Sequence, residues 1–285
     1  MPSVCALLLT ILSLFPISAL SQNKKTPALS RPPQLLRTTA RHELRRFAFG
    51  GTVTVIGAPE GSITIEGWSR SEVEVSAEIQ LRADTEADLD LLARVNTFVL
   101  DEDMNHLRVL TTGTHDTTFM RAVAKKFPKT LLGLPWRIDY RIRVPVATDL
   151  EINAGRGAIN LAGVEGNIRL SGTESEANLK VSGGTLSATI AVGKVNLNIP
   201  VRSWRGVGAE IRLAAGEMTI ELPSGFNGDI DAEVLRSGQI SDSYGGLEPR
   251  EKPGITPQNM KARAGTGGAS LQLTVGDGTI IIKKQ

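Results

Sequence analysis

Histidines are the first side chains to examine for chemistry, because they can serve as ligands, acids or bases near neutral pH. The chain has three of them, His42, His106 and His115, and none stands in a metal-binding spacing such as H-E-x-x-H. His115 and Asp116 form the one neighbouring acid/base pair. Because adjacent residues of a strand point to opposite faces, we predict a polar loop here rather than a catalytic dyad.

Carboxylates are numerous enough for a glycosidase pair, which needs two acids whose environments set their pKa values apart. Asp229 and Asp231 are two residues apart and would share one strand face. Glu217 and Glu221 are expected on neighbouring strands. Nothing in the sequence around either set would raise a pKa, so we favour solvated strand faces over a catalytic pair.

Other catalytic motifs are missing from the sequence: it holds no G-x-S-x-G, no P-loop and no G-x-G-x-x-G. The glycine-rich run 265–268 precedes a strand rather than a helix, so we predict a turn and not a phosphate cradle. Trp204 could stack on a sugar or a base, but covering the end of a coil is the favoured role. The sequence therefore assigns no catalytic residue, no cofactor and no metal ligand.

A basic stretch between residues 117 and 143 is the remaining candidate for binding. It carries seven Lys or Arg side chains against Asp139, interleaved with aromatic residues and leucines. The residues predicted to contact a surface are Arg121, Lys125, Lys126, Lys129, Trp136 and Arg137. Such a stretch could lie on an anionic membrane or a glycan. The favoured alternative is a long loop over the sheet edge, because Pro128, Gly133 and Pro135 prevent a long amphipathic helix.

The elements that would position these residues are mainly strands. Apolar residues make up 41% of the 285, enough for a core, while aromatics are 4% and glycines number 29, which is typical of turn-rich β structure. Residues 73–81 alternate strictly between apolar and polar, which predicts a half-buried strand. Residues 52–56 and 62–66 are β-rich, and the Gly-Ala-Pro-Glu-Gly between them predicts a hairpin.

One helix is predicted over residues 84–96, where apolar residues recur at helical spacing and Asp84 or Thr85 can cap the first turn. Residues 84–103 hold seven acidic side chains against Arg94. The acids in the first turns favour the helix dipole. We prefer this structural role to calcium binding, because the run lacks the glycine and terminal glutamate of a calcium loop.

The sequence changes in character after residue 150. Twenty-two of the 29 glycines but only three aromatic residues fall there. Short alternating strands are predicted at 158–161, 167–170, 178–181, 195–199, 210–213 and 218–222. So short a unit cannot hold a core alone, so the units must stack, either as a β-solenoid or as a meandering sandwich. Glycine is expected at the corners, where the backbone takes positive φ.

These strand and glycine motifs resemble a known group. The matching segments are 140–145, 150–152, 157–159, 164–168, 217–223, 228–232, 237–240, 265–273 and 276–282. Over roughly residues 44 to 285 the chain resembles the bacterial putative-adhesin β-strand-repeat family of exported proteins. The resemblance implies a β-helical or stacked-sheet body and transfers no catalytic residues. The chain departs from the plainest members in its basic insertion at 117–137 and at 241–260, a predicted projecting loop.

The N-terminus has the layout of a secretion signal. An apolar run from Val4 to Phe15 is followed by Pro16 and small residues, and cleavage is expected after Ser21. An uncleaved anchor is the alternative. The one cysteine, Cys5, lies in this signal, so the mature chain would form neither a disulfide nor a thiolate metal site.

The sequence thus predicts an all-β protein in four parts: a signal peptide (1–21), a disordered leader (22–43), an N-terminal β region with one helix and a basic insertion (44–149), and a glycine-rich β-repeat domain (150–285). The predicted role is an exported, non-enzymatic scaffold or binding surface for cell-envelope material, glycan or protein, in the periplasm, on the cell surface or secreted. Alternatives are a carbohydrate-active enzyme on a β-helix and a peripheral membrane protein. The 32 basic and 30 acidic side chains argue against nucleic acid as a partner.

Overall fold

The computed structural model describes residues 34–123, 127–252 and 254–285. The predicted signal peptide and its cleavage point, most of the leader, and Lys125 and Lys126 lie outside these ranges. Residues 34–285 form one compact unit. The all-β fold class is confirmed, since the strands of the described ranges join into one large sheet.

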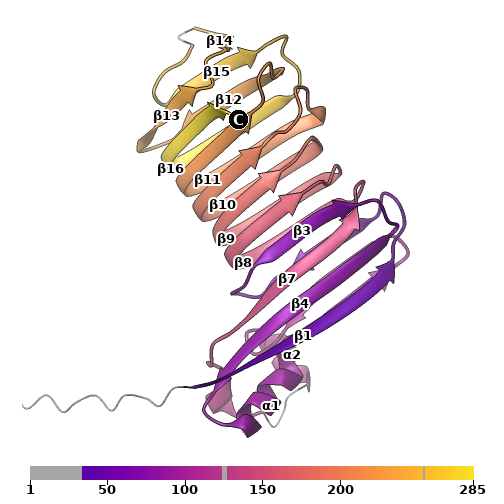
Figure 1. The fold of residues 1–285 in the computed structure, drawn as a ribbon. Coiled ribbons are helices and arrows are strands. Elements are labelled where there is room, and N and C mark those ends of the chain that lie inside the picture. The colour runs from indigo at the N-terminus through magenta and orange to yellow at the C-terminus, as the bar shows by residue number, and fades with distance from the viewer. Residues whose placement is uncertain (1–33, 124–126, 253) are drawn as a thin grey trace, which may run out of the picture. The chain divides into compact units, whose positions relative to one another are not determined.

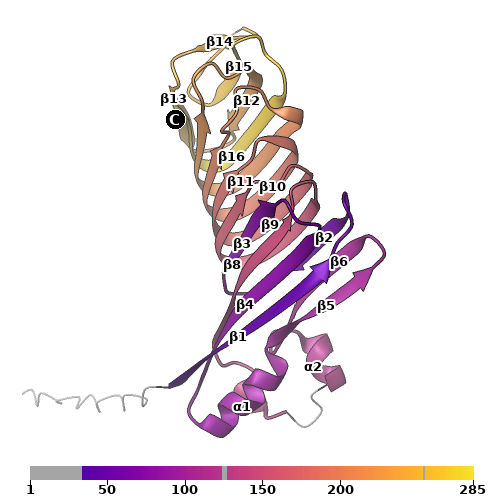
Figure 2. The same ribbon diagram turned by 45° about the vertical axis from the view of Figure 1, so that its right-hand side comes forward.

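The first half of this unit holds seven strands and three short helical segments within the described ranges. They are β1 (Leu35–Arg46), β2 (Thr52–Ile56), β3 (Ile63–Trp68), β4 (Glu72–Ala83), α1 (Glu86–Val95), β5 (Thr97–Asp103), β6 (His106–Thr112), α2 (Thr117–Val123), η1 (Lys129–Leu131) and β7 (Trp136–Pro145). β1, β4, β7 and β3 follow one another in the sheet, while β5, β6 and β2 form a second row that also reaches β8 (Figure 2).

The second half is a stack of long parallel strands that each turn a corner (Figure 1). They are β8 (Asp149–Ala162), β9 (Asn167–Lys180), β10 (Gly183–Asn198), β11 (Arg205–Leu222) and β16 (Ser270–Lys284). Leu150 pairs with Ile168, and Ile168 with Leu186, so the chain advances by 18 residues from β8 to β9 and again from β9 to β10. The later coils are longer, because Leu186 pairs with Ala209 and Ala209 with Leu271. This regular parallel register is that of a β-solenoid and decides against a sandwich.

Each coil therefore has two outward surfaces. The surface named here the lane face is built from residues 158–162, 176–180, 194–198, 217–222 and 279–284. The opposite face is built from residues 149–153, 167–171, 185–189, 208–213 and 270–275.

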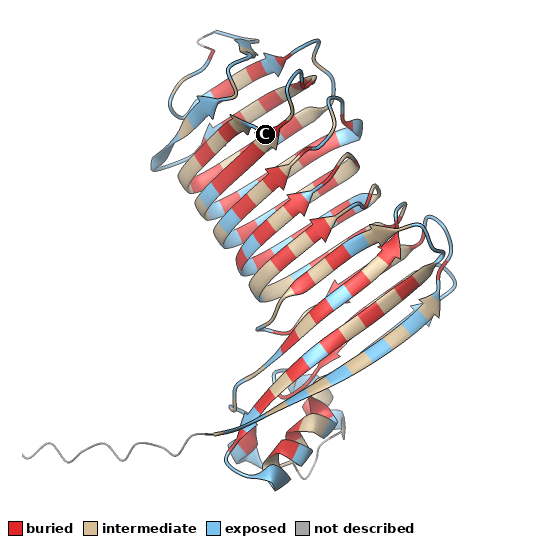
Figure 3. Ribbon diagram, in the orientation of Figure 1, coloured by how far each residue is buried: buried red, intermediate tan, exposed pale blue. Residues whose placement is uncertain are grey.

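The core lies between the two faces and consists of aligned aliphatic side chains. Leu161, Leu179, Leu197, Ile220 and Ile282 follow one another in register behind the lane face, and all are buried. Exposed and buried residues alternate along each strand (Figure 3). Full burial of one such side chain stabilises the fold by about 1.5–3 kcal/mol, so each coil is held by its neighbours rather than by itself.

Glycines occupy the corner between the faces, as the sequence predicts. Gly157, Gly193, Gly216 and Gly278 fall in one row with φ between +137° and +146°, and Ser175 of β9 takes the place between Gly157 and Gly193. A Cβ on Gly216 would lie 1.8 Å from the carbonyl oxygen of Gly193. Glycine is needed here for two reasons, because the backbone is left-handed and the next coil leaves no room for a side chain.

The predicted hairpin of residues 52–66 is wrong. β2 and β3 do not pair with each other: β2 runs parallel to residues 149–153 of β8, and β3 runs parallel to residues 159–162. The segment between them, with Gly61 at φ +143°, turns a solenoid corner instead of reversing the chain. Glycine marks both kinds of turn, so only the partner strand distinguishes them.

The predicted helix is present as α1, with the Thr85 side chain accepting a hydrogen bond from the backbone N–H of Asp88. Leu89 and Leu92 are buried. The acidic run around it is partly neutralised by arginines, because Arg37 pairs with Glu86 and Asp90. The shorter helix α2 was not predicted.

Two boundaries differ from the prediction. β1 begins at Leu35, inside the predicted leader, and pairs with β4 along its whole length although none of its residues is buried. Because β1 has no buried face, apolar residues do not alternate along it. Its position in the sheet is set by backbone pairing with β4. The predicted projecting loop at 241–260 contains β14 (Leu247–Pro249), which pairs with β15 (Asn259–Ala264), and its Met260 is buried.

The remaining strands close the coil stack. β12 (Gly228–Val234) and β13 (Gly238–Ser243) both run parallel to β16, on its two halves, and β15 pairs antiparallel with β12.

Candidate functional site

The basic segment predicted to bind a surface is divided among several elements. Arg121 is exposed on α2 and Lys129 is exposed in η1. Most apolar side chains near these cations turn inward: Met120 and Leu131 are buried, and Phe127 packs partly buried against the core. Among the described residues of the segment, Leu132 is the one exposed large apolar side chain, at 40%, which is little for membrane insertion.

Trp136 and Arg137 belong to β7 and have structural partners. The Trp136 ring lies 5.4 Å from the His115 ring and packs against the core. Arg137 forms an ion pair with Asp139 at 2.7 Å, which raises the pKa of Arg137. Burial by itself would raise the pKa of Asp139, but the hydrogen bonds from Arg137 and Ser62 hold it below its ordinary value.

The His115–Asp116 pair is a helix cap. Asp116 Oδ1 accepts hydrogen bonds from the backbone N–H groups of Thr118 at 2.9 Å and Phe119 at 3.0 Å. Burial lowers the pKa of His115. The loop interpretation is confirmed, since the carboxylate binds the backbone of α2 rather than the imidazole.

Three of the four carboxylates considered for glycoside hydrolysis, Asp229, Asp231 and Glu221, are engaged in ion pairs. Asp229 bonds Arg263 at 3.0 Å, and Asp231 pairs with Arg250. Glu217 and Glu221 lie on the same strand, β11, and not on neighbouring strands as predicted. The long strand passes continuously through the corner row and on to the lane face, which short predicted segments could not reveal.

A histidine, a hydroxyl and a carboxylate do meet on the opposite face. His106 Nε2 lies 2.7 Å from Thr54 Oγ1, and Thr54 Oγ1 donates to Glu151 at 3.2 Å. Glu151 therefore contacts the hydroxyl group. In a nucleophilic triad the carboxylate instead orients the histidine, which accepts the hydroxyl proton.

Two further sequence motifs have structural roles. Trp204 is 6% exposed, and its Nε1 donates to the carbonyl of Gly184 at 3.0 Å, so it covers the coil as favoured. The run 265–268 is the predicted turn, closed by a hydrogen bond from Gly267 N to Ala264 O at 3.1 Å. Among the described residues no cluster of three His, Cys, Asp or Glu could hold a metal, and no described helix is long and apolar enough to cross a membrane.

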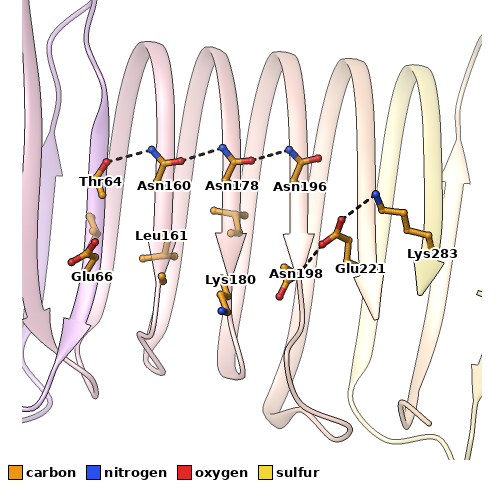
Figure 4. Close-up of a pocket in the computed structure, with 13 residues that line it drawn as sticks. Thr64, Glu66, Asn160, Leu161, Asn178, Lys180, Asn196, Asn198, Glu221 and Lys283 are labelled. Atoms are coloured by element: carbon orange, nitrogen blue, oxygen red, sulfur yellow. Dashed lines mark hydrogen bonds and ion pairs between the residues drawn. The ribbon is translucent and has the colours of Figure 1, made fainter. Parts of the chain in front are cut away.

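The lane face holds the most distinctive polar arrangement. Three asparagines, one per coil, form a row across the strands that ends at a threonine of β3 (Figure 4). Asn196 donates to Asn178 at 2.8 Å, Asn178 donates to Asn160 at 3.1 Å, and Asn160 donates to Thr64 at 3.3 Å. We call Thr64, Asn160, Asn178 and Asn196 the amide lane.

The amide lane is the floor of a shallow hollow of about 580 Å³. Its four side chains point outward yet are half-buried, and Thr219, the next residue in register, is 7% exposed. Residues two positions further along the strands form one wall: Glu66, Ala162, Lys180, Asn198, Glu221 and Lys283. Four of these six have longer side chains than the floor residues and stand beside them.

The wall is largely neutralised by its own contacts. Glu221 accepts a hydrogen bond from Asn198 at 2.8 Å and pairs with Lys283 at 3.1 Å. The pKa of Glu221 lies below its ordinary value, first because of the Asn198 bond and then because of Lys283. Glu66 lies 3.7 Å from Arg143.

A second hollow of about 460 Å³ continues the site onto the N-terminal strands. It lies over β1, β4, β7 and β3 and shares Thr64 with the first hollow. Arg141, exposed in its lining, forms no ion pair with the described residues. The polar surface therefore extends over several strands of one sheet.

Sequence reasoning missed the amide lane although its signal was present. Asn160, Asn178 and Asn196 recur every 18 residues, in segments that were already predicted as strands. The 18-residue period is needed to see that the three align, and the predicted strand segments alone do not give it.

The fold and the site define a β-solenoid with a hollowed polar face that carries a row of asparagines. A scan of the sequence against known protein families gives no match, and a search of curated proteins gives none either. Among solved structures, a chain described as a putative cell adhesion protein from Clostridium sporogenes is similar, with 13% identity, a TM-score of 0.46, and coverage of 87% of this chain and 100% of that chain.

A chain described as a putative adhesin from Bacteroides fragilis is also similar, with 10% identity, a TM-score of 0.28, and coverage of 87% of this chain and 97% of that chain. Both TM-scores are below 0.5, so the solenoid assignment stands on the strand pairings of this chain alone.

Proposed function

We propose that this protein is an exported, non-enzymatic, adhesin-like binding protein whose lane face holds the ligand. The observation that carries the proposal is the amide lane: hydrogen-bonding side chains held in a hollow on an outward surface. Within the lane, each asparagine uses one of its two N–H groups and at most one lone pair of its oxygen. Each therefore keeps one donor and at least one acceptor for a ligand.

The regular repeat supports binding over an extended area. Strands in the solenoid are about 4.8 Å apart, so equivalent side chains recur at that interval. A polymer with repeating polar groups can contact several coils at once, and weak contacts of this kind add to a useful avidity. The signal-like N-terminus supports export, and an envelope ligand follows from that location.

The binding experiment uses the full mature chain and an isolated cell-envelope fraction. We expect the chain to co-sediment with the fraction, and the double variant Asn160→Leu/Asn178→Leu to lose most of this binding. The matched control is Asn153→Leu with Ser171→Ala, because these two side chains form the same kind of hydrogen bond, at 2.7 Å, on the opposite face. Equal binding by the lane and control variants would contradict the proposal.

The non-enzymatic part is tested by release of reducing ends from polysaccharides. A general acid needs a raised pKa, whereas the pKa of Glu221 in the hollow is lowered. We expect no turnover above the buffer blank. Turnover that disappears in Glu221→Gln would establish a glycosidase and overturn this part of the proposal.

A further inference from the structure

We propose that the amide lane binds an uncharged polysaccharide whose chain runs across the strands, from β3 toward β10. This inference rests on the proposed function and specifies the ligand and its direction. It depends on the charge of the lane, on the unused hydrogen-bonding capacity of its side chains, and on their alignment.

The charge of the hollow favours a neutral ligand. None of the four lane residues is ionisable. In the wall, Glu221 and Lys283 neutralise each other at 3.1 Å, and Glu66 faces Arg143 at 3.7 Å. Lys180 is the one wall cation with no ion pair to a described residue. An anionic polymer would need a row of such cations, one per repeat, and the lane does not supply it.

The hydrogen-bonding capacity favours hydroxyl groups. Each lane asparagine keeps one N–H and at least one oxygen lone pair, so donors and acceptors alternate along the lane. A hydroxyl can donate and accept at the same time and matches either group. An extended polypeptide, by contrast, is recognised chiefly by backbone pairing at a sheet edge, and the lane lies on a sheet face.

The alignment sets the direction of the chain. The lane residues lie on β3, β8, β9 and β10, so the lane spans three strand intervals, about 14 Å. Along a single strand the pattern is different, because Asn178 is flanked on its own face by the charged Glu176 and Lys180. A neutral polymer that follows the amides must therefore cross the strands.

Affinity electrophoresis of the full mature chain tests the proposal. The gels contain a neutral polysaccharide (dextran, mixed-linkage β-glucan or galactomannan) or anionic polygalacturonate. We expect retardation in at least one neutral polymer, little changed between 50 and 500 mM salt, as screening requires of an uncharged ligand.

Single variants at the two ends of the lane test the direction. Thr64→Val and Asn196→Leu are each expected to weaken the retardation about fivefold, the effect of one lost hydrogen bond. Glu176→Gln, outside the lining of the hollow, and the opposite-face variant Asn153→Leu are expected to leave it unchanged. Asn196→Ser removes the same amide but keeps a short polar side chain, so it replaces Asn196→Leu if the leucine variant misfolds. Circular dichroism checks that each variant keeps its β structure.

The outcomes separate the two proposals. Envelope binding without retardation in any neutral polysaccharide would overturn the ligand class and leave the proposed function standing. Retardation that is lost in Lys180→Gln and falls with salt would identify an anionic ligand. Retardation reduced by Glu176→Gln but not by Thr64→Val would place the polymer along a strand. Capture of an uncharged Ser/Asn peptide instead of any polysaccharide would mean a protein ligand.

Discussion

The two outward faces of the solenoid are built by the same coils yet offer different surfaces. On the opposite face Asp149 bonds Asn167, Glu151 pairs with Arg169, and Ser171 donates to Asn153, all with 18-residue spacing. The lane face repeats the same spacing with three asparagines. Asn153 is exposed, whereas Asn178 is half-buried.

The difference lies in the side chains beside each row. On the lane face, lysine and glutamate stand next to short amides, which therefore form the floor of a hollow. On the opposite face Glu151 and Arg169 extend into solvent, and a hollow of about 430 Å³ is lined mainly by small and apolar residues instead of amides. One backbone repeat can therefore carry two surfaces, and the side chains of each face decide what its hollow can bind.

The largest effect on both faces is expected from a substitution at the corner that joins them. Gly216→Ala places a Cβ 1.8 Å from the carbonyl oxygen of Gly193 at φ +139°. We expect it to lower the free energy of unfolding by about 3 kcal/mol or more, since strain and steric overlap add. Urea denaturation measures this change.

Gly133→Ala is the control for this prediction. Gly133 has no positive φ, and a Cβ there would meet nothing within 4 Å. A loss of stability in Gly133→Ala as large as in Gly216→Ala would contradict the corner argument.

A matched pair of asparagines compares the faces directly. Asn178→Ala removes two hydrogen bonds, to Asn160 and from Asn196, in a half-buried row. We expect it to cost about 1–2 kcal/mol of unfolding free energy. Asn153→Ala removes one exposed bond and should cost less than about 0.5 kcal/mol. Thermal unfolding measures the stability of both variants. Equal losses of stability would contradict the expected difference between the two faces.

The stability contributed by Asp277, next to the corner glycine of β16, is expected to depend on pH. The hydrogen bonds from Arg236 and Ser237 lower the pKa of Asp277 from 3.8 to about 2. Because the folded-state pKa is the lower one, this group stabilises the fold above pH 4 and loses its contribution as pH falls from 4 to 2. The effect should be small, because the group is exposed.

Asp277→Asn is the test of this prediction. The variant should be less stable than the natural chain at pH 6 and should converge with it at pH 2, as measured by urea midpoints across that range. A constant difference at all pH values would show that the carboxylate charge is not the cause.

The smallest effect is expected at the basic segment. Its apolar residues Met120 and Leu131 are buried and Leu132 is 40% exposed, so little apolar surface remains to insert into a membrane. We expect the natural chain and the double variant Arg121→Glu/Lys129→Glu to sediment equally, and weakly, with anionic vesicles. Salt-sensitive binding that the double variant abolishes would instead support peripheral membrane association through residues 117–137.

Much of the fold was predictable because its signals are local. The alternation in β4, the cap and apolar spacing of α1, and the glycine corners all depend on neighbours a few residues away. The wrong hairpin at β2 and β3 shows the limit, because glycine is common to reversing turns and to solenoid corners. β1 was missed since none of its residues is buried.

The sequence by itself determined that this protein is a turn-rich β protein with short stacked units, because period-two patterning and glycine placement are written in consecutive residues. Only the tertiary structure decided that β8, β9 and β10 are parallel with an 18-residue advance, and hence that Asn160, Asn178 and Asn196 meet. The physical reason is register. Which strand lies beside which is fixed by packing across the whole stack, and a polar row exists only after that choice is made.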